Sequence, residues 1–315
     1  MAWLHTSLLF VSIVAYRLVN VLIINTQFDP DEYWQTLEPA YCLAYSSSSE
    51  QNCALTWEWK RRMSNGGEGE GLPNTYAYLG TFINEALHGP VRSFVPILPT
   101  YFLYKMLQMT HLDSTWMVAK APLLLNAVFV AAPTDFAVYY VSKFIFGRTN
   151  ENATRNDMFY KVETWALILT LTNWFNGYCL VRTYSNSLET VLVSIGLVIL
   201  CPELFGNVQI KDKFQVRFVA RVAFLLGGLS VVIRFTALAA WIPIGLIICA
   251  RRKSIKSSFY YLWHICILPG LAGVVLGCII DRYFYGFWAI PFLGSFHFNA
   301  LLGRFIYNIY IDVEC

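Results

Sequence analysis

Long apolar runs recur along the chain and predict a protein that crosses a membrane many times. The first run covers residues 4–24 and holds a single charge, Arg17. The further runs cover residues 117–141, 163–181, 188–202, 218–233, 236–250, 262–280 and 286–303. Because lipid offers the backbone no hydrogen-bond partner, each run should be a helix. Several runs are shorter than the ~20 residues that a perpendicular span needs, so their limits are approximate.

The overall composition supports the same fold class. Hydrophobic residues make up 57% of the 315 residues and charged residues 14%, against about 45–50% and about 25% in soluble domains. The first run lacks the leading basic residues and short apolar core of a secretory signal peptide, which favours a retained helix. The net charge of +3 is small, and no basic face indicates nucleic acid. We therefore predict an all-α polytopic membrane protein, with residues 1–315 forming a single multispan domain.

Basic residues in short loops predict the orientation, because lysine and arginine concentrate on the cytosolic side. The strongest basic cluster lies in 251–256, which we place in the cytosol. Counting back through the spans puts the basic residues of 211–217 and 143–161 on the same side. The segments that this count places on the luminal side are 182–189, Arg234 and 281–285.

The same count requires that the apolar segment 94–110 does not cross the membrane. Pro96 and Pro99 shorten any helix there. We interpret the segment as an interfacial helix within one large luminal loop, about 26–116, with a re-entrant segment as the alternative.

Three carboxylates open this luminal loop, directly after the first helix. Asp29 as N-cap, Pro30 at the first helical position and Glu32 at the third form a helix-start signature. Asp31 is not needed for the cap, and the positive end of the helix dipole keeps it ionised. An ionised carboxylate at a lipid–water boundary is a candidate general base. Because Asp31 and Glu32 are adjacent, their side chains should diverge rather than share a proton.

The segment Leu55–Trp59 places tryptophans beside an acid. Tryptophans at a membrane interface commonly anchor a protein among the lipid headgroups. The alternative is an aromatic platform for a sugar or a lipid at Trp57, with Glu58 as a hydrogen-bond acceptor.

Charged residues at span ends form a second set of candidates: Arg182, Arg234, Asp281 and Arg282. An arginine at a helix centre costs about 2.5–3.5 kcal/mol on insertion scales, so such residues pair or line a cavity, unless they reach the nearer interface. Arg17 lies deep in the first predicted helix, and we expect it to have a buried carboxylate partner from the luminal loop. The remaining charges, together with Asp31 and Glu32, predict one polar luminal cavity suited to a lipid phosphate beside a base.

The eight cysteines show no metal-binding spacing, so no metal site is predicted. Five lie in or near spans and are interpreted as apolar residues: Cys179, Cys201, Cys249, Cys266 and Cys278. Cys42 and Cys53 share the luminal loop, where a disulfide is compatible with an oxidising lumen. Their geometry is not fixed by the sequence.

The stretch Pro30–Glu38, with its PDEYWQ core, resembles the GPI mannosyltransferase III family of the GT-C superfamily. Four further stretches resemble this family: 17–20, 55–59, 182–190, and 281–286 followed by 296–299. The resemblance extends from about residue 15 to residue 303. Members transfer mannose from dolichyl-phosphate-mannose to a GPI-anchor precursor, as the third, α-1,2-linked mannose.

The resemblance implies a GT-C fold in the endoplasmic reticulum membrane with a luminal active site. It implies that Asp31 is the catalytic base, that Glu32 is a supporting acid, and that transfer inverts the anomeric centre. The substrate-binding residues would be Trp57, Glu58, Arg182, Arg234, Asp281, Arg282 and Tyr285. The partners would be the lipid-linked donor, the glycolipid acceptor and membrane lipid, without a metal or other cofactor.

The chain departs from the family pattern in two places. Residues 62–74 form an insertion rich in glycine and glutamate, and the ending 309–315 does not match the further luminal motif and spans of the family. We therefore expect a form shortened at its C-terminus. The alternative functions are a mannosyltransferase for N-glycan precursors or another GPI step, a multispan transporter, and an inactive shortened isoform. Paired inverted repeats that would favour a transporter are not evident.

Overall fold

The computed structural model describes residues 2–26, 30–45, 55–60, 89–146, 161–206, 213–252 and 254–301. Every regular element in these ranges is helical, as predicted. The α-helices are α1 (Ala2–Ile23), α2 (Pro30–Glu32), α3 (Glu38–Tyr45), α5 (Leu98–Met109), α6 (Thr115–Asn126), α7 (Ala132–Phe146), α8 (Val162–Thr172), α9 (Trp174–Cys179), α10 (Ser185–Phe205), α11 (Lys213–Ile233), α12 (Leu238–Ala250), α13 (Ile255–Tyr261), α14 (Leu268–Tyr285) and α15 (Pro291–Phe296). Short 3₁₀-helices are η2 (Trp57–Trp59), η3 (Val95–Ile97) and η6 (Phe235–Ala237), and π-helices are η1 (Tyr33–Leu37), η4 (Ala127–Ala131), η7 (Leu262–Ile267) and η8 (His297–Leu301).

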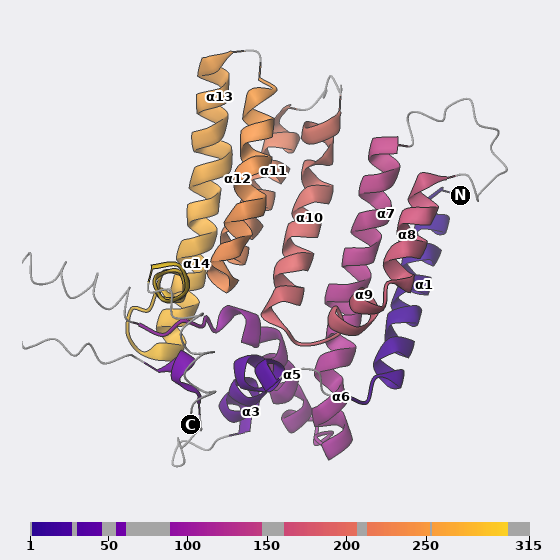
Figure 1. Cartoon of the computed structure of the whole chain (residues 1–315), viewed down its shortest axis with the longest axis vertical. Coiled ribbons are helices and arrows are strands. Elements are labelled where there is room, and N and C mark those ends of the chain that lie inside the picture. Colours follow the sequence, from indigo (N-terminus) through magenta and orange to yellow (C-terminus); the bar gives the residue numbers. More distant parts are fainter. Residues whose placement is uncertain are drawn as a thin grey trace, which may run out of the picture.

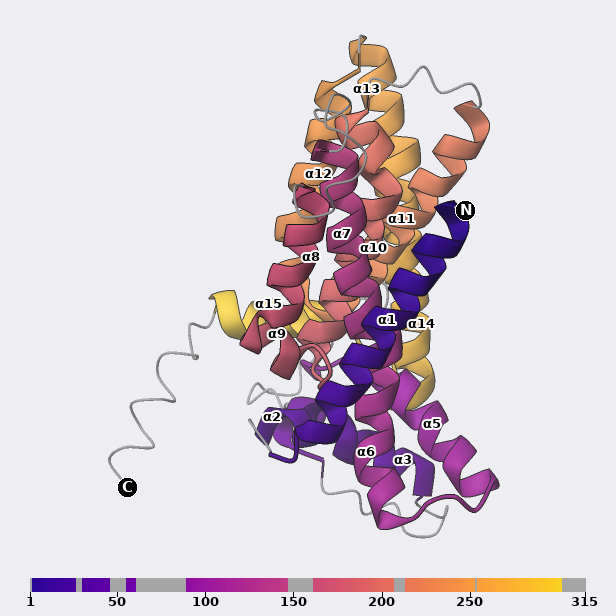
Figure 2. The same cartoon turned by 90° about the vertical axis from the view of Figure 1, so that its right-hand side faces the viewer.

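Long apolar helices form a bundle in which α1, α7, α10, α11 and α14 lie side by side (Figures 1 and 2). Within the described ranges, five helical stretches are long and apolar enough to cross a membrane. They are Thr6–Ile23, Thr115–Phe146, Ser185–Phe205, Gln215–Ile233 and Ile255–Tyr285. These stretches indicate a multi-pass membrane protein, as the sequence predicts.

The predicted span 163–181 is wrong as a single helix. Its apolar helix α8 has 11 residues and ends where Asn173 leaves the helical conformation, with ψ at 115°. The Asn173 side chain then accepts the Asn176 N–H at 3.2 Å and starts α9. An asparagine that caps a new helix therefore interrupts the apolar run.

The predicted span 286–303 is also wrong over the part that the structure describes. Gly286 ends α14 in the left-handed conformation, with φ at 76°, where glycine has no Cβ penalty. A new helix, α15, begins only at Pro291 and has six residues before the five-residue η8. The run 236–250 forms η6 and the 13-residue α12, which is apolar but shorter than a span.

Three of the π-helices end two residues before a proline. In each, the residue directly before the proline donates its N–H to a carbonyl five residues back: Glu38 to Tyr33, Ala132 to Ala127 and Leu268 to Trp263. The following prolines, at 39, 133 and 269, have no N–H and crowd the carbonyl four residues back. The wider turn relieves this crowding without breaking the helix.

The segment predicted to lie at the interface forms η3 and the 12-residue α5, which is shorter than a span. Helix α5 packs against α3 at one end of the bundle, away from α13 (Figure 1). Ala40, Ala44, Tyr104 and Leu107 form the buried contact between the two helices. The arrangement agrees with an element outside the membrane-crossing bundle, and its luminal side stays a prediction.

Close helix contacts hold the second half of the bundle together. Trp241 on α12 lies against Gly196 on α10 and Gly227 on α11, where an added Cβ would come within 2.2 and 2.7 Å of its ring. Its indole N–H donates to the Ser230 hydroxyl at 2.9 Å. Helices α11 and α14 meet through glycines in the same way, since a Cβ on Gly228 would lie 1.9 Å from the Gly270 carbonyl oxygen. Such small residues let membrane helices approach closely.

The five cysteines predicted to be apolar residues are free thiols, and three of them, Cys201, Cys249 and Cys266, are buried. Cys42 is disulfide-bonded. Cys53, its predicted partner, lies outside the described residues, so this pairing stays a prediction.

Candidate functional site

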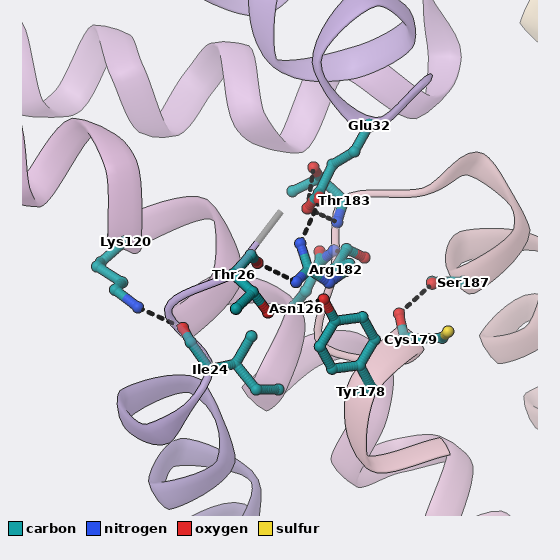
Figure 3. Close-up of polar contacts among 10 residues, drawn as sticks. All are labelled: Ile24, Thr26, Glu32, Lys120, Asn126, Tyr178, Cys179, Arg182, Thr183 and Ser187. Carbon is teal, nitrogen blue, oxygen red and sulfur yellow. Dashed lines mark hydrogen bonds and ion pairs between the residues drawn. The ribbon is translucent and has the colours of Figure 1, made fainter. Parts of the chain in front are cut away.

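A buried ion pair joins the last residue of α2 to the turn before α10 (Figure 3). Arg182 Nη1 lies 2.6 Å from Glu32 Oε2, and the two side chains are 3% and 2% exposed. The other Glu32 oxygen, Oε1, accepts from the backbone N–H and the hydroxyl of Thr183, both at 3.3 Å. Three donors from neighbouring residues therefore satisfy one carboxylate, as a buried charge requires.

The Arg182 guanidinium also contacts the segment that follows α1. Its Nη2 donates to the Thr26 carbonyl, and the guanidinium lies 4.2 Å from the centre of the Tyr178 ring. The Tyr178 and Thr26 hydroxyls are 2.9 Å apart. Arg182 thus fixes residues on both sides of the corner between α1 and α2.

Helix α6 supplies the outer supports of this corner (Figure 3). Lys120 Nζ donates to the Ile24 carbonyl at 2.6 Å and to Asn25 Oδ1 at 2.9 Å, beside the C-terminal end of α1. A cation at this end of a helix is favoured by the helix dipole. Asn126 Nδ2 donates to the Arg182 carbonyl at 2.6 Å. Three separate parts of the chain therefore position the residues around Glu32.

Asp31 lies on the opposite side of α2 from this network. Glu32 and Thr36 are buried, whereas Asp31 is exposed. The two acids diverge, as their adjacency predicts. Trp34, which the sequence analysis assigned no role, is also exposed, and its carbonyl accepts the Trp59 indole N–H at 3.0 Å. The surface around Asp31 combines a carboxylate with an accessible aromatic ring.

A cavity of about 70 Å³ lies on the inner side, lined by Thr36, Asn126, Phe129 and Thr183 among others. A water molecule takes up about 30 Å³ in the liquid, so this cavity has room for about two water molecules.

Trp57 and Glu58 lie on η2. The third residue of this helix, Trp59, links it to Trp34 through the hydrogen bond described above. Glu58 Oε1 lies 2.9 Å from Arg92 Nη2, and its carbonyl accepts the Val91 N–H at 2.9 Å. Trp57 is half exposed, and its ring centre lies 5.0 Å from that of Phe298. Glu58 is thus engaged in an ion pair, and Trp57 offers an open ring face.

Asp281 and Tyr285, near the end of α14, contact the segment before η3. Asp281 has no exposed surface, and its Oδ1 accepts from the Phe94 N–H at 2.7 Å and the Ser93 hydroxyl at 3.0 Å. The Tyr285 hydroxyl donates to the Arg92 carbonyl at 2.7 Å. Both side chains therefore secure the segment that carries Arg92.

The last two predicted residues lie nearer the surface. Arg234 is 34% exposed and lies 3.6 Å from Glu189 on α10. The Arg282 guanidinium is partly exposed and lies 5.8 Å from the Trp288 ring centre. The contacts of the predicted site residues form separate groups, and their shared side of the membrane stays a prediction. A single cavity that joins them stays a prediction.

Arg17 has the buried carboxylate partner that the sequence predicts, but from a different element. Its Nε and Nη2 lie 2.6 and 2.8 Å from the two carboxylate oxygens of Asp135, and neither side chain is exposed. Asp135 lies on α7, so the expected partner from the luminal loop is wrong. Asp135 is the one acid in the apolar run 117–141, which is the signal that identifies it.

Comparison with known proteins gives one consistent result. The model of the Alg9-like mannosyltransferase family matches residues 8–64 and 88–309. Mannosyltransferase APTG1 of Arabidopsis thaliana is 31% identical over 296 residues, or 93% of this chain and 43% of the relative. GPI alpha-1,2-mannosyltransferase 3 of Bos taurus is 28% identical over 295 residues, or 93% and 44%. GPI mannosyltransferase 3 of Yarrowia lipolytica is 29% identical over 293 residues, or 92% and 46%.

The chain thus spans less than half the length of these relatives. No solved structure matches it.

Proposed function

Because the chain belongs to the Alg9-like mannosyltransferase family, we propose that it transfers mannose from dolichyl-phosphate-mannose to a GPI-anchor precursor. The product would carry the third mannose in α-1,2 linkage, as the names of the GPI mannosyltransferase relatives suggest. The donor already holds an activated sugar, so the proposal needs no separate cofactor. The family favours an enzyme over the transporter alternative.

The exposure of Asp31 next to the buried Glu32–Arg182 pair carries this proposal. Asp31 accepts the proton of the acceptor hydroxyl while the hydroxyl oxygen bonds to the anomeric carbon of mannose. The bond from that carbon to the phosphate oxygen breaks, and the lipid phosphate leaves with the electron pair. One displacement converts the β-linked donor into an α-linked product.

Glu32 and Arg182 act on this reaction through position. Both are buried and engaged with one another, so neither reaches a sugar without breaking an ion pair. Their role is to hold the corner that presents Asp31. Arg234 and Arg282, which keep exposed surface, are the candidates to stabilise the charge that develops on the leaving phosphate.

The proposed compartment is the lumen of the endoplasmic reticulum. The end of the bundle that carries α13 also carries the basic cluster of 251–256, which favours the cytosol. Helix α2, which carries Asp31, lies toward the other end of the bundle, near α3 (Figure 2).

A transfer assay on membranes that contain this chain tests the proposal. Membranes are supplied with radiolabelled dolichyl-phosphate-mannose and a GPI precursor that carries two mannoses. We expect label in the GPI product, and a loss of about 10²–10⁴-fold for Asp31→Asn, the range of a general base. Glu38→Gln is the matched control, because Glu38 is an exposed acid about two helical turns further on.

Equal transfer by Asp31→Asn and the unchanged chain would reject the catalytic role. Label in an N-glycan precursor instead of the GPI product would support the related mannosyltransferase. Absence of transfer from the unchanged chain, at normal protein level in the membrane, would support the inactive shortened isoform.

A further inference from the structure

An aromatic groove lies at the end of the bundle that carries α13, away from α2 and α3 (Figure 2). Its volume is about 420 Å³, and its walls come from α13 and η7: Ile255, Lys256, Phe259, Tyr260, Trp263 and His264. Phe259 is 69% exposed and Trp263 46%. Both belong to a stretch that is long and apolar enough to cross a membrane. Aromatic side chains near the end of such a stretch lie at the boundary between lipid and water.

Two arginines of the neighbouring helix α11 lie beside this groove. Arg217 and Arg221 are four residues apart, so their side chains project from the same face of the helix. The Arg217 guanidinium lies 5.9 Å from the centre of the Tyr260 ring, which lines the groove. Both arginines belong to the apolar stretch Gln215–Ile233, where charged side chains are costly.

Glycine contacts show how deep the second arginine lies. Gly228 on α11 lies against Gly270 on α14, and Val232, one turn further along α11, lies against Gly277. The two helices therefore run in the same direction, and η7, which precedes α14, packs against the earlier part of α11. Arg221 thus lies beside η7, one turn further from the end of the bundle than the first arginine.

The positive charge at the groove is not balanced by the part of the chain that the structure describes. Arg217, Arg221 and Lys256 form no ion pair or hydrogen bond with a carboxylate in the described ranges. Glu203, an acid at this end of α10, is already paired with Arg252. Three cations therefore surround one apolar groove, and each can still accept an anionic partner.

The sequence around the groove adds to this surplus. Segment 251–256 holds four basic residues and no acid, and segment 211–217 holds three basic residues and one acid. The same basic residues led us to predict that this end faces the cytosol. Clusters of four to eight lysines and arginines on the cytosolic side of a membrane helix attract anionic lipids.

We propose that this groove binds an anionic glycerophospholipid. Its phosphate contacts Lys256, Arg217 and Arg221, and one acyl chain lies along the exposed rings of Phe259 and Trp263. The surplus of positive charge selects an anionic headgroup over a zwitterionic one, and the apolar groove selects a lipid over a free phosphate. The site lies at the opposite end of the bundle from α2, so it goes beyond the proposed function and takes no part in the transfer of mannose.

Native mass spectrometry of the chain in detergent tests binding without requiring transfer. The chain is titrated with phosphatidylglycerol and, separately, with phosphatidylcholine that has the same acyl chains. We expect phosphatidylglycerol to bind more tightly. Arg217→Gln, Arg221→Gln and Lys256→Gln should each weaken its binding about fivefold, the usual contribution of one basic residue near a membrane surface. Phe259→Ala should also weaken it, because the acyl chain loses an apolar contact while the charge is unchanged.

Lys143→Gln is the matched control. Lys143 is an exposed cation 5.8 Å from a tyrosine ring on α7, which lies apart from α13 (Figure 1). This variant should bind phosphatidylglycerol like the unchanged chain, and Arg221→Lys should keep most of the binding because it keeps the charge.

Equal binding of the two phospholipids would overturn the inference, and so would equal losses in Lys143→Gln and Arg221→Gln. Displacement of phosphatidylglycerol by cholesterol, with the three glutamine variants binding cholesterol as well as the unchanged chain does, would assign the groove to a sterol instead. Failure of mannose transfer in the membrane assay would leave the result of this titration unaffected.

Discussion

Arg17 on α1 and Asp135 on α7 form a two-point ion pair that is fully buried between membrane-crossing helices. They are 118 residues apart in the sequence. Each charge is costly inside a bilayer, and each removes most of the cost of the other. The pair therefore fixes how α1 sits against α7, and with it the position of the corner that follows α1.

Removal of one member of this pair should destabilise the protein more than removal of both. Arg17→Leu leaves Asp135 buried without a counter-charge, for which we expect a loss of about 3–5 kcal/mol. The double variant Arg17→Leu/Asp135→Leu should recover most of that loss, because it buries apolar groups instead. Thermal unfolding in detergent measures the effect. A double variant that melts as low as the worse single variant would contradict the argument.

Loss of the Arg182 side chain should disturb the surface around position 31. In an Asp31→Cys background, a membrane-impermeant maleimide reports the accessibility of that residue. Arg182→Leu removes contacts to Glu32 and Thr26 and should change the labelling rate, because the corner loses its support. Arg234→Leu is the control, since its partly exposed pair is worth at most about 1 kcal/mol. Equal labelling rates in both variants would argue against a positioning role.

The glycine contact between α11 and α14 should not tolerate a methyl group. Gly228→Ala would place Cβ 1.9 Å from a backbone oxygen of α14, and the helices must separate to relieve it. We expect a loss of about 1–3 kcal/mol, typical of overpacking. Gly177→Ala is the control, because its nearest neighbour would lie at 3.7 Å, an ordinary contact. Unfolding in detergent should separate the two variants, and similar melting temperatures would refute the packing argument.

Asp281 should act mainly as an anchor for the segment before η3. Asp281→Asn keeps an oxygen that can accept from the Phe94 N–H, whereas Asp281→Leu removes it. We expect limited proteolysis near residues 92–95 to accelerate in Asp281→Leu and to change little in Asp281→Asn. Rapid cleavage of both variants would show that holding the segment requires the carboxylate charge and not only an acceptor oxygen.

The sequence predicts the local features of the candidate site well. Adjacent acids at a helix start must point apart, and Asp31 and Glu32 do so. Counting spans predicts one side of the membrane for Glu32 and Arg182, and their contact agrees with a shared side. Pairing between distant helices is different, because it depends on which faces meet. The partner of Arg17 was therefore predicted correctly as a carboxylate but from the wrong element, although Asp135 is the one acid in the apolar run 117–141.

Helix breaks inside apolar runs were missed for a related reason. Apolar residues continue on both sides of Asn173, and the predicted run 286–303 begins at Gly286, so a sum over either window suggests a span. The decisive features are a capping side chain and a left-handed glycine followed by a proline, and each acts through one hydrogen bond or one dihedral angle. Such features change little in the hydropathy that is summed over an apolar segment.

The π-helices that precede three prolines affect how related sequences should be compared. Each wide turn holds one residue more than an α-turn, which rotates the following helix by about 100° relative to a regular wheel. In the continuous stretch 255–285, a wheel drawn from the first half therefore assigns the wrong lipid-facing side after residue 267. When buried and lipid-exposed positions are compared between related sequences, a new helical wheel should therefore be drawn from each of Pro39, Pro133 and Pro269.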